Sequence, residues 1–473
     1  MAHRIPGKFS LVAVGLIVVL AAGSVWAMDS SGIRDLMAGV DHEVVFEPGN
    51  PESAKGIPVN FDNAATTPAF KSVLDAIRDE MDTYAAIGRS YGAKSTISTA
   101  RYNEYRQTVL EFFGADAKRG QDDKYTVIYV NNTTDGLNRL SEMLVGGKDD
   151  LVITSRMEHH ANDLPWRNRA TVLHAEVDDH GHLDVAEVQR LLVENAGKVK
   201  LVSITAASNV TGYVNDVHDI ARRAHKYGAK IVVDGAQIAA HKPFSMRGKT
   251  PEEDIDFFVF SAHKLYAPFG GGAIIGLQDE LEIAPPAWRG GGNVQVVTDE
   301  TVRLLEPPDR HEAGSPNYFG VVAMHQAMKE IMSDRVGGFD YLVHHEMQLL
   351  SKTVEAMRQM PEVEMYNFCT DRACPTRDKC DQIGEDRVGI VVFNVKGISS
   401  RVVAKELAQK GIATREGAFC AHTYAARLMK VSEDQLKRTG HPPRMIRVSF
   451  GIYNSEEEVD YFLKTLKEII AAK

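Results

Sequence analysis

Two short apolar segments, each ending near an ionisable side chain, constrain this chain most strongly. Residues 231–233 are Ile-Val-Val and precede Asp234, while residues 257–260 are Phe-Phe-Val-Phe and lead through Ser261 to Lys264. Continuous apolar runs are typical of parallel strands covered on both faces, and open α/β sheets bind ligands at the carboxyl ends of their strands. A buried carboxylate needs a cationic partner, and a desolvated lysine becomes a better nucleophile. The pattern therefore predicts an α/β sheet with Asp234 and Lys264 in one site.

One acid and one lysine at strand ends suit pyridoxal 5′-phosphate (PLP). The lysine amine forms a Schiff base with the cofactor, and the carboxylate pairs with the protonated pyridine nitrogen, which makes the ring a better electron sink. Each residue alone is ordinary, because Asp-Gly after a strand is often a turn and most lysines are solvated. Their combination with Gln237 and with Ser261 and His263 favours a PLP site.

The pattern Asp-Gly-Ala-Gln, followed by Ser-x-His-Lys, resembles the class V aminotransferase family of fold type I PLP enzymes. Segments similar to that family's active-site segments are found at residues 60–65, 157–162, 165–166, 208–212 and 312–317 (Glu-Ala-Gly-Ser-Pro-Asn). The sequence Arg-Glu-Gly-Ala-Phe-Cys at 415–420 resembles the Arg-x-Gly-x-x-Cys loop of group II cysteine desulfurases and selenocysteine lyases. The resemblance runs from about residue 58 to the end of the chain.

Strand and helix signals alternate over most of the chain. Strands are expected at 125–130, 151–154, 200–205, 388–395 and 445–450, and helices at 134–145, 185–193, 217–227, 318–333, 338–359, 400–410 and 456–471. The alternation before residue 318 indicates a mostly parallel sheet with helices on both faces. We therefore expect an α/β fold of type I, with a seven-stranded sheet by resemblance. Its expected parts are an N-terminal segment (28–75) packing with the small domain, a large PLP-binding domain (76–317) and a smaller α+β C-terminal domain (318–473).

The cofactor phosphate is expected at Thr133 and Thr134, between a strand and a helix. Backbone N–H groups at a helix N-terminus and threonine hydroxyls suit a dianion. The resemblance implies that Ser261 and His263 also bind the phosphate. It further implies that Ser315 reaches the phosphate of a partner subunit, and hence a homodimer.

The resemblance assigns the remaining cofactor and substrate contacts. It implies that His159 stacks on the pyridine ring and moves protons, and that Asn209 and Gln237 contact the ring oxygen. Arg415 and Arg447 are the candidates for the substrate carboxylate, because the guanidinium fork binds carboxylates in a bidentate manner. The alternative for either arginine is a local ion pair, and Glu416 stands beside Arg415.

Cys420 determines which reaction is expected. A desulfurase needs an accessible thiolate that attacks the sulfur of a PLP-bound cysteine, giving L-alanine and an enzyme persulfide. The alternative is a small buried core residue. Glu416, Ala418 and Phe419 depart from group II enzymes, which have Thr or Ser after the arginine and His-His before the cysteine. Other readings are another class V activity (selenocysteine lyase, epimerase or aminotransferase) or a non-catalytic exported binding protein.

The other three cysteines, Cys369, Cys374 and Cys380, cluster in one polar segment. Their spacing is not that of the usual paired zinc motif, so we expect no metal site, and we expect a disulfide or a surface loop. A metal site or a persulfide relay to Cys420 is the alternative. The net charge of −10, with no long basic run, argues against nucleic-acid binding. The expected partners are an amino-acid substrate, a second subunit and a sulfur-acceptor protein.

The N-terminus has the pattern of a secretory signal peptide. Basic residues precede an apolar stretch at 9–23, and Val25-Trp26-Ala27 offers a small-residue cleavage site. Residues 1–27 therefore predict an exported, periplasmic or membrane-anchored protein. If Met28 is the true start, the enzyme is cytoplasmic. A twin-arginine pair is absent from this segment.

Overall fold

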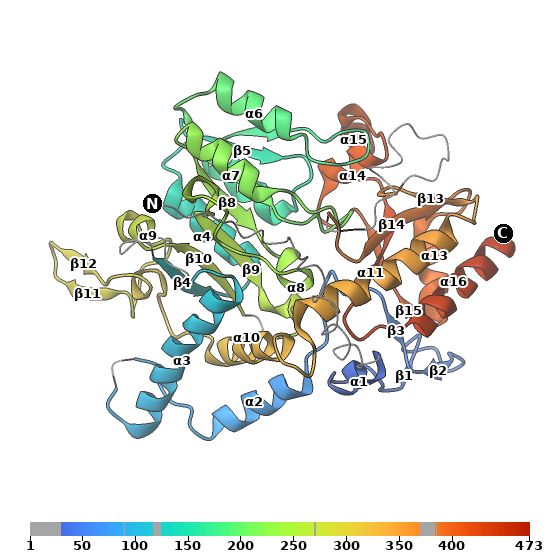
Figure 1. Ribbon diagram of the computed structural model, residues 1–473, viewed down its shortest axis with the longest axis horizontal. Coiled ribbons are helices and arrows are strands. Elements are labelled where there is room, and N and C mark those ends of the chain that lie inside the picture. The colour runs from blue at the N-terminus through green and yellow to red at the C-terminus, as the bar shows by residue number, and fades with distance from the viewer. Residues whose placement is uncertain (1–29, 89, 117–123, 269–270, 369–383, 385) are drawn as a thin grey trace, which may run out of the picture.

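The computed structural model describes residues 30–88, 90–116, 124–268, 271–368, 384 and 386–473. The expected signal segment 1–27 with Met28, and the three cysteines Cys369, Cys374 and Cys380, lie outside the described residues. A large sheet with its helices occupies one side of the molecule, and a smaller C-terminal sheet lies beside it (Figure 1).

The large sheet has seven strands within the described ranges. Their spatial order is β4 (Tyr125–Val130), β10 (Gly272–Leu277), β9 (Phe257–Ser261), β8 (Lys230–Asp234), β7 (Val199–Thr205), β5 (Leu151–Ser155) and β6 (Thr171–Ala175). Strand β10 runs antiparallel to both of its neighbours, and the pairs from β9 to β6 are all parallel. This arrangement confirms the expected α/β class and the mostly parallel seven-stranded sheet.

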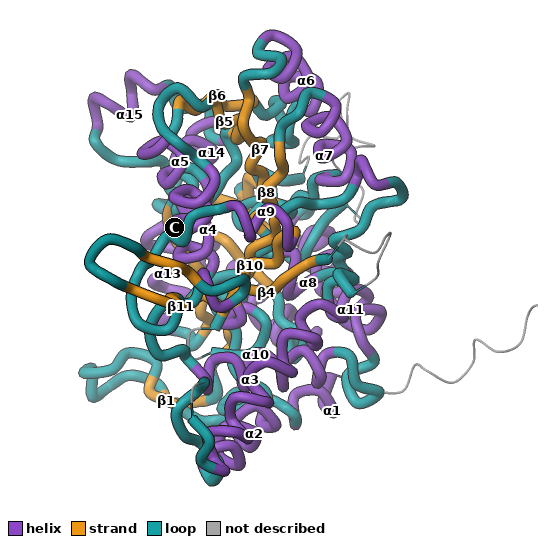
Figure 2. Tube along the Cα trace, turned by 90° about the vertical axis from the view of Figure 1, so that its left-hand side faces the viewer, coloured by secondary structure: helices purple, strands orange, loops and turns teal. Residues whose placement is uncertain are grey.

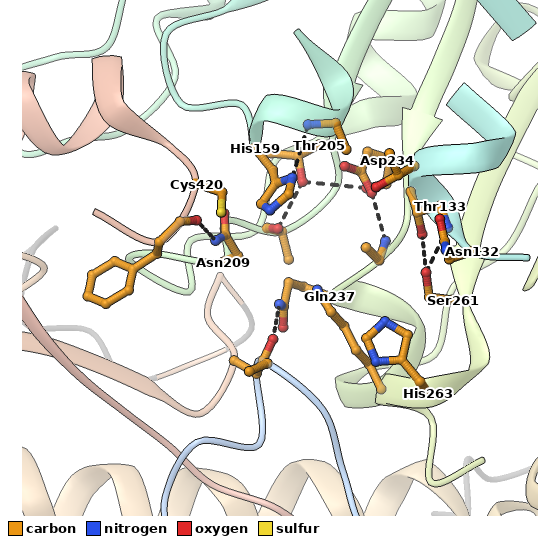
Figure 3. A pocket seen from close by; sticks show the side chains of 18 of the residues that line it. Asn132, Thr133, His159, Thr205, Asn209, Asp234, Gln237, Ser261, His263 and Cys420 are labelled. Carbon is orange, nitrogen blue, oxygen red and sulfur yellow. Dashed lines mark hydrogen bonds between the residues drawn. The ribbon is translucent and has the colours of Figure 1, made fainter. Parts of the chain in front are cut away.

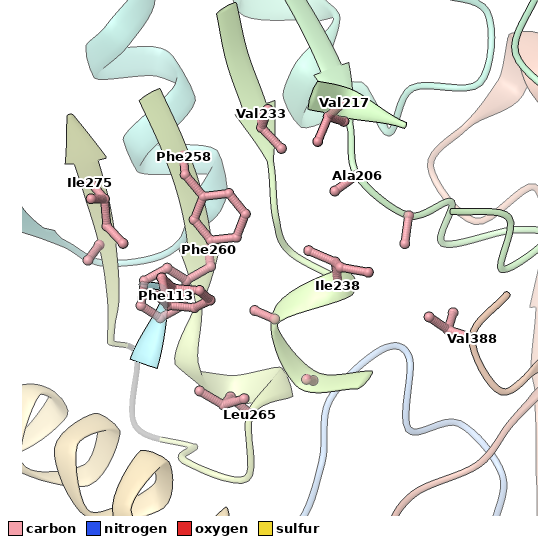
Figure 4. Packing of buried hydrophobic residues seen from close by; sticks show 14 of the residues in the cluster. Phe113, Ala206, Val217, Val233, Ile238, Phe258, Phe260, Leu265, Ile275 and Val388 are labelled. Carbon is pink, nitrogen blue, oxygen red and sulfur yellow. The ribbon is translucent and has the colours of Figure 1, made fainter. Parts of the chain in front are cut away.

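Alternate residues of each central strand pack into different cores. Phe257 and Val259 contact one cluster, while Phe258 and Phe260 contact the other. The first core includes α4 (Thr133–Leu144), α5 (Leu164–Arg169) and α9 (Gln278–Ile283). The second includes α6 (Val185–Glu194), α7 (Val217–Lys226) and α8 (Ile238–His241). Figure 2 shows α4 and α5 on one side of the strands and α6 and α7 on the other, and Figure 4 shows Phe258, Phe260 and Val233 in the second core. Apolar side chains on both faces explain the continuous apolar runs.

The smaller sheet is antiparallel, in the order β13 (Val363–Met365), β14 (Ile390–Val395), β17 (Met445–Ser449) and β16 (Arg415–Gly417). The described residues after 337 include the helices α11 (Gly338–Met357), α13 (Ser400–Gln409), α14 (His422–Leu428), α15 (Glu433–Thr439) and α16 (Glu456–Ala471). Ser455 and Glu458 form the capping box of α16.

The N-terminal segment contacts the C-terminal part of the chain at several points. Strand β3 (Val59–Asn60) pairs in parallel with β15 (Ile412–Ala413), and Arg34 forms an ion pair with Glu458, with 2.7 Å between Nη1 and Oε1. Two short hairpins and a helix lie outside the two main sheets: β1 (Val44–Val45) with β2 (Lys55–Gly56), β11 (Val294–Val297) with β12 (Val302–Leu304), and α1 (Ser30–Asp35). None of the helices in the described ranges combines the length and apolar composition that a membrane span needs.

Helix α3 (Ala93–Phe112) has no counterpart among the helices expected from the sequence. Its buried side chains are mostly polar or amphipathic: Ser95, Ser98, Tyr102, Arg106 and Val109. A helix that buries such a face shows no apolar stripe, which is the signal used to recognise helices. Helix α10 (Tyr318–Ile331) packs on both α3 and α2 (Lys71–Met81). Its packing on α3 covers part of the polar face of α3.

Candidate active site

A cavity of about 300 Å³ lies at the carboxyl ends of β7, β8 and β9, where they face the smaller sheet (Figure 3). It brings together nearly all the site residues expected from the sequence: Thr133, Thr134, His159, Asn209, Asp234, Gln237, Ser261, His263, Lys264, Arg415, Cys420 and Arg447. They come from segments spread over some three hundred residues of the chain. Parallel strands present their carboxyl ends at one edge of the large sheet, and the smaller antiparallel sheet supplies Arg415 and Arg447 from the other side of the cavity.

Asp234 and Lys264 are the charged groups at the floor of this cavity. Asp234 is 3% exposed, and one of its oxygens accepts a hydrogen bond of 2.9 Å from the N–H of Ala236. Burial raises the pKa of Asp234 above its usual value. Burial also lowers the pKa of Lys264 to about 8, although Asp234 opposes the shift. A cationic ring nitrogen would stabilise the Asp234 carboxylate, and the lysine amine is partly neutral near pH 8.

A polar cradle lies at the first turn of α4. The N–H of Thr133 donates to Ser261 Oγ over 2.7 Å, and the two hydroxyl oxygens lie 2.7 Å apart. Gly272 stands directly beneath: a Cβ there would lie 2.6 Å from the carbonyl oxygen of Phe260 and 3.1 Å from Cα of Asn132. Glycine is therefore required for β10 to approach the start of α4 so closely. The positive end of the α4 helix dipole also lies at this cradle, which favours an anion.

Two amide side chains also line the cavity. Gln237 Nε2 donates to the carbonyl oxygen of Ala64 over 2.8 Å, while its Oε1 is buried and has no hydrogen-bond partner among the described residues. Asn209 Nδ2 donates to the carbonyl oxygen of Phe419 over 2.8 Å. The Oε1 of Gln237 can accept a hydrogen bond from a ligand hydroxyl. The Nδ2 of Asn209 instead donates to the loop that carries Cys420.

His159 lies over the cavity at the end of β5. Its Nδ1 accepts a 3.0 Å hydrogen bond from the N–H of Ala161, so the neutral ring carries its proton on Nε2. Burial, with a smaller contribution from Lys264, lowers the pKa of His159 to about 3. The preceding residue, Glu158, is 2% exposed and accepts hydrogen bonds from Ser155 and Asn162, which hold the turn that presents His159.

Arg447 and Arg415 face the cavity from adjacent strands of the smaller sheet. Arg447 is 3% exposed, and it donates from Nη1 to the carbonyl oxygen of Asn209 over 2.7 Å and from Nη2 to Asp62 over 3.0 Å. Arg415 is 54% exposed and lies 3.5 Å from the other oxygen of Asp62. The suspected local partner of Arg415, Glu416, pairs with Arg444 instead, with 2.6 Å between Nε and Oε1. Glu416 therefore does not draw the Arg415 side chain away from the cavity, which Arg415 lines.

Cys420 is exposed at the mouth of the cavity, so it is not the buried core residue that was its alternative. Phe419 and Cys420 both have positive φ, 51° and 54°, which side chains other than glycine adopt at an energetic cost. The strained turn is held by two hydrogen bonds, from Asn209 to the carbonyl oxygen of Phe419 and from the N–H of His160 to that of Cys420 (2.7 Å).

Ser315 does not line this cavity. It lies in a second, smaller cavity of about 150 Å³ together with Arg139 and Glu312. Glu312 receives two hydrogen bonds from the buried Arg106, at 2.8 and 2.9 Å, which secure the loop that carries Ser315. Within this single chain, Ser315 is therefore separate from the Lys264 site.

The structure adds two residues for which no role was predicted. Asp62 contacts both arginines, and His160 holds the backbone of Cys420. Both lie in segments that resemble the family's active site, but neither residue type at its position signals a contact with a distant strand. Only the three-dimensional arrangement reveals these roles.

The residues present fit PLP. Asp234 suits the ring nitrogen, the free oxygen of Gln237 suits the ring hydroxyl, Lys264 suits the aldehyde, and the first turn of α4 with Ser261 suits the phosphate. His263 lines the same cavity, with its Nδ1 3.2 Å from the hydroxyl oxygen of Thr66.

Known proteins resemble this chain in sequence and in fold. A probable cysteine desulfurase of Chlamydia muridarum (strain MoPn / Nigg) is 32% identical over 425 residues, which is 87% of this chain and 94% of that protein. The cysteine desulfurase of Dickeya dadantii (strain 3937) is 31% identical, over 88% of this chain and 93% of that protein. The chain spans only 63% of the length of another relative, probable cysteine desulfurase 1 of Mycobacterium leprae (strain TN), at 33% identity over 88% of this chain.

A solved structure agrees with these relatives. The apo structure of a cysteine desulfurase from Thermococcus onnurineus NA1 superimposes with a TM-score of 0.73 at 28% identity, covering 88% of this chain and 95% of that one. The sequence model of the aminotransferase class-V family matches residues 59–462, which include every residue of the Lys264 cavity. The chain therefore belongs to the class V aminotransferase family of PLP-dependent enzymes.

Proposed function

We propose that this enzyme is a cysteine desulfurase, which converts L-cysteine to L-alanine and leaves the sulfur as a persulfide on Cys420. The observation that carries the proposal is the position of an exposed thiol in the same cavity as Lys264 and Arg447. An aminotransferase or epimerase has no use for a thiol there. The relatives named above are cysteine desulfurases by name and match most of this chain's length, which supports the same reaction.

The orientation of the substrate follows from the side chains that line the cavity. Bound PLP supplies an electron sink that makes the bonds to the substrate Cα easier to break. Arg447 and Arg415 are placed to hold the α-carboxylate, and Lys264 and His159 line the same cavity. An amino acid held in this way directs its side chain toward the cavity mouth, where Cys420 lies.

Lys264 is the better of the two candidates for moving the α-proton. His159 carries its proton on Nε2 and has a pKa of about 3, so it is a weak base. Lys264 has a pKa of about 8, which suits proton transfer near neutral pH. We therefore assign the α-proton to Lys264 Nζ and a packing role over the ring to His159.

Cys420 completes the reaction. Its thiolate attacks the substrate sulfur, an S–S bond forms, and the bond between that sulfur and the substrate Cβ breaks. The bonding electron pair stays with the substrate carbon, which then takes up a proton to give alanine. A thiol or an acceptor protein later removes the terminal sulfur from Cys420.

The direct test is to incubate the purified, PLP-loaded chain with L-cysteine and a reductant. We expect alanine and sulfide in equal amounts. Formation of alanine and selenide from selenocysteine, with no turnover of cysteine, would instead make the enzyme a selenocysteine lyase. Racemised or transaminated products without sulfide would contradict the proposal.

We also propose a homodimer. Apolar side chains are exposed on and before the β11–β12 hairpin, and these are Ile283 (80%), Trp288 (57%), Val296 (45%), Val297 (61%) and Val302 (59%). Such clusters mark interaction surfaces. A second copy would cover them, and its Ser315 could then approach the α4 cradle from outside.

Val297→Asp is expected to weaken that dimer by at least about tenfold, because burying an unpaired charge costs more than 1.4 kcal/mol. Light scattering across a dilution series measures the change. Val193, which is 52% exposed on α6, provides the control, since Val193→Asp adds the same charge away from the hairpin. A wild-type protein that is monomeric at all concentrations would contradict the homodimer.

We propose, from the pattern of residues 1–27 alone, that the enzyme is exported or anchored at a membrane. Cell fractionation of the full chain and of a chain starting at Met28 tests this. Only the full chain should leave the cytoplasm. Recovery of both forms in the cytoplasm would make Met28 the functional start.

A further inference from the structure

The two substrate-site arginines form a cross-strand pair. Arg415 of β16 stands directly opposite Arg447 of β17 in the antiparallel register, so both side chains project from the same face of the smaller sheet. Both line the cavity that holds Lys264 and Cys420. Like charges on directly opposed residues repel, and burial of Arg447 lowers the pKa of its guanidinium. This pair therefore needs an anion close by.

Asp62 is that anion. Its Oδ1 accepts from Arg447 Nη2 over 3.0 Å, and its Oδ2 lies 3.5 Å from Arg415 Nη1, so one carboxylate bridges the two guanidinium groups. The backbone around Asp62 is fixed. Its N–H donates to Asn60 Oδ1 over 3.1 Å, and it forms a parallel bridge with Ser449 at the end of β17.

The pair and its bridge carry one net positive charge at the substrate end of the cavity as long as the nearby Cys420 thiol keeps its proton. Arg415 and Arg447 contribute two cations and Asp62 one anion, while Asp234 and Lys264 at the other end face the cofactor. Within the part of the chain that the structure describes, Arg447 Nε has no partner, and Arg415 is 54% exposed with one contact to Asp62 at 3.5 Å. The site can thus accept one further carboxylate and no more without leaving negative charge unpaired.

We propose that Asp62 is a specificity-determining residue, which limits the substrate site to amino acids with a single carboxylate. It does so by compensating one of the two arginine charges, so that only one positive charge remains for a ligand carboxylate. The proposal rests on the proposed function only in assigning the substrate carboxylate to these two arginines. Removing the charge of Asp62 should release Arg415 at the cavity mouth, where an acidic side chain would meet it.

The test compares the binding of L-alanine and L-aspartate to the PLP-loaded enzyme by calorimetry. Asp62→Asn keeps the shape of the side chain, and we expect it to shift the ratio of the two dissociation constants toward L-aspartate by roughly tenfold, the effect of one unit charge at a partly solvated site. The double variant Asp62→Asn with Arg415→Gln restores the charge count and should return the ratio to the wild-type value. A merely structural role for Asp62 would make the double variant worse, and would not restore the ratio.

Glu416 supplies the matched control. It is the neighbour of Arg415 on β16, but it is bound by Arg444 and by Ser400 Oγ (2.8 Å). Glu416→Gln therefore removes one negative charge, as Asp62→Asn does, without removing a contact of Arg415 or Arg447. Its ratio should equal that of the wild type. If Asp62→Asn does not fold, Arg415→Gln alone is informative because its side chain is exposed, and it should increase the preference for L-alanine.

The outcomes separate this inference from the proposed function. Neither amino acid contains sulfur, so an unchanged ratio in Asp62→Asn or in Arg415→Gln would overturn the role of Asp62 even if sulfide release from L-cysteine is normal. A shifted ratio without any sulfide release would support Asp62 and overturn the desulfurase assignment. Failure of the wild type to bind L-alanine would overturn the assignment of the arginines themselves.

Discussion

Lys264→Ala is expected to abolish the visible absorbance of lysine-linked PLP and to reduce turnover by at least about a thousandfold. The reduction is large because the same amine both links the cofactor and transfers the α-proton, and general base catalysis alone contributes about 10² to 10⁴. Absorbance spectra of the purified variant and assays of alanine formation measure the two effects. Retention of the absorbance band would show that another group holds the cofactor.

Lys230 provides a control for this substitution. It begins β8, at the end of the sheet opposite to the cavity, and pairs with Glu280 over 2.8 Å. Lys230→Ala removes a lysine from the neighbouring strand without touching the cavity, so absorbance and turnover should stay close to those of the wild type. Loss of the band in both variants would indicate a general loss of folding.

The pH dependence of cofactor uptake tests the environment of Lys264 in the same experiment. The neutral amine is the nucleophile, and its fraction increases as the pH rises through the pKa. Because burial lowers that pKa to about 8, the rate at which the cofactor-free protein takes up PLP should rise up to about pH 8 and then level off. A rate that keeps rising toward the ordinary lysine value of 10.5 would contradict the burial of the amine.

Much of the cofactor site follows from local sequence. The strand ends that carry Asp234 and Lys264 are recognisable because both faces of β8 and β9 are buried, which produces continuous apolar runs. The turn before α4 is recognisable because Asn132 caps the helix, accepting from the N–H of Asp135. Short-range signals of this kind need only one element at a time.

Contacts between distant segments were not predictable in the same way. Glu416 could pair with its neighbour Arg415, and the choice of Arg444 depends on the pairing of β16 with β17. The bridge from Asp62 to Arg415 and Arg447 joins residues more than three hundred and fifty positions apart. The sequence around each of these residues does not indicate the contact, because the contact depends on how the N-terminal segment packs on the smaller sheet.

Cys420→Ala is expected to reduce sulfide release from L-cysteine by at least about a hundredfold while the enzyme keeps its cofactor absorbance. The thiolate is the group that accepts the substrate sulfur, and no other described cysteine is present to replace it. The fold should tolerate the change because the side chain is exposed, and the turn is held through backbone groups: the carbonyl oxygens of Phe419 and Cys420 accept from Asn209 and His160.

Two measurements distinguish loss of the nucleophile from damage to the site. The affinity for L-alanine should be unchanged, since Arg447, Arg415 and Lys264 contact the parts of the amino acid that alanine shares with cysteine. Mass spectrometry of the wild type after one turnover should find one added sulfur on the peptide containing Cys420, and none on that peptide in the variant. Normal sulfide release by Cys420→Ala would remove the thiol from the mechanism. The turn at Ala418 and Phe419 would then serve to shape the cavity. Phe419 lines the cavity, and the guanidinium carbon of Arg447 lies 5.1 Å from the centroid of the Phe419 ring.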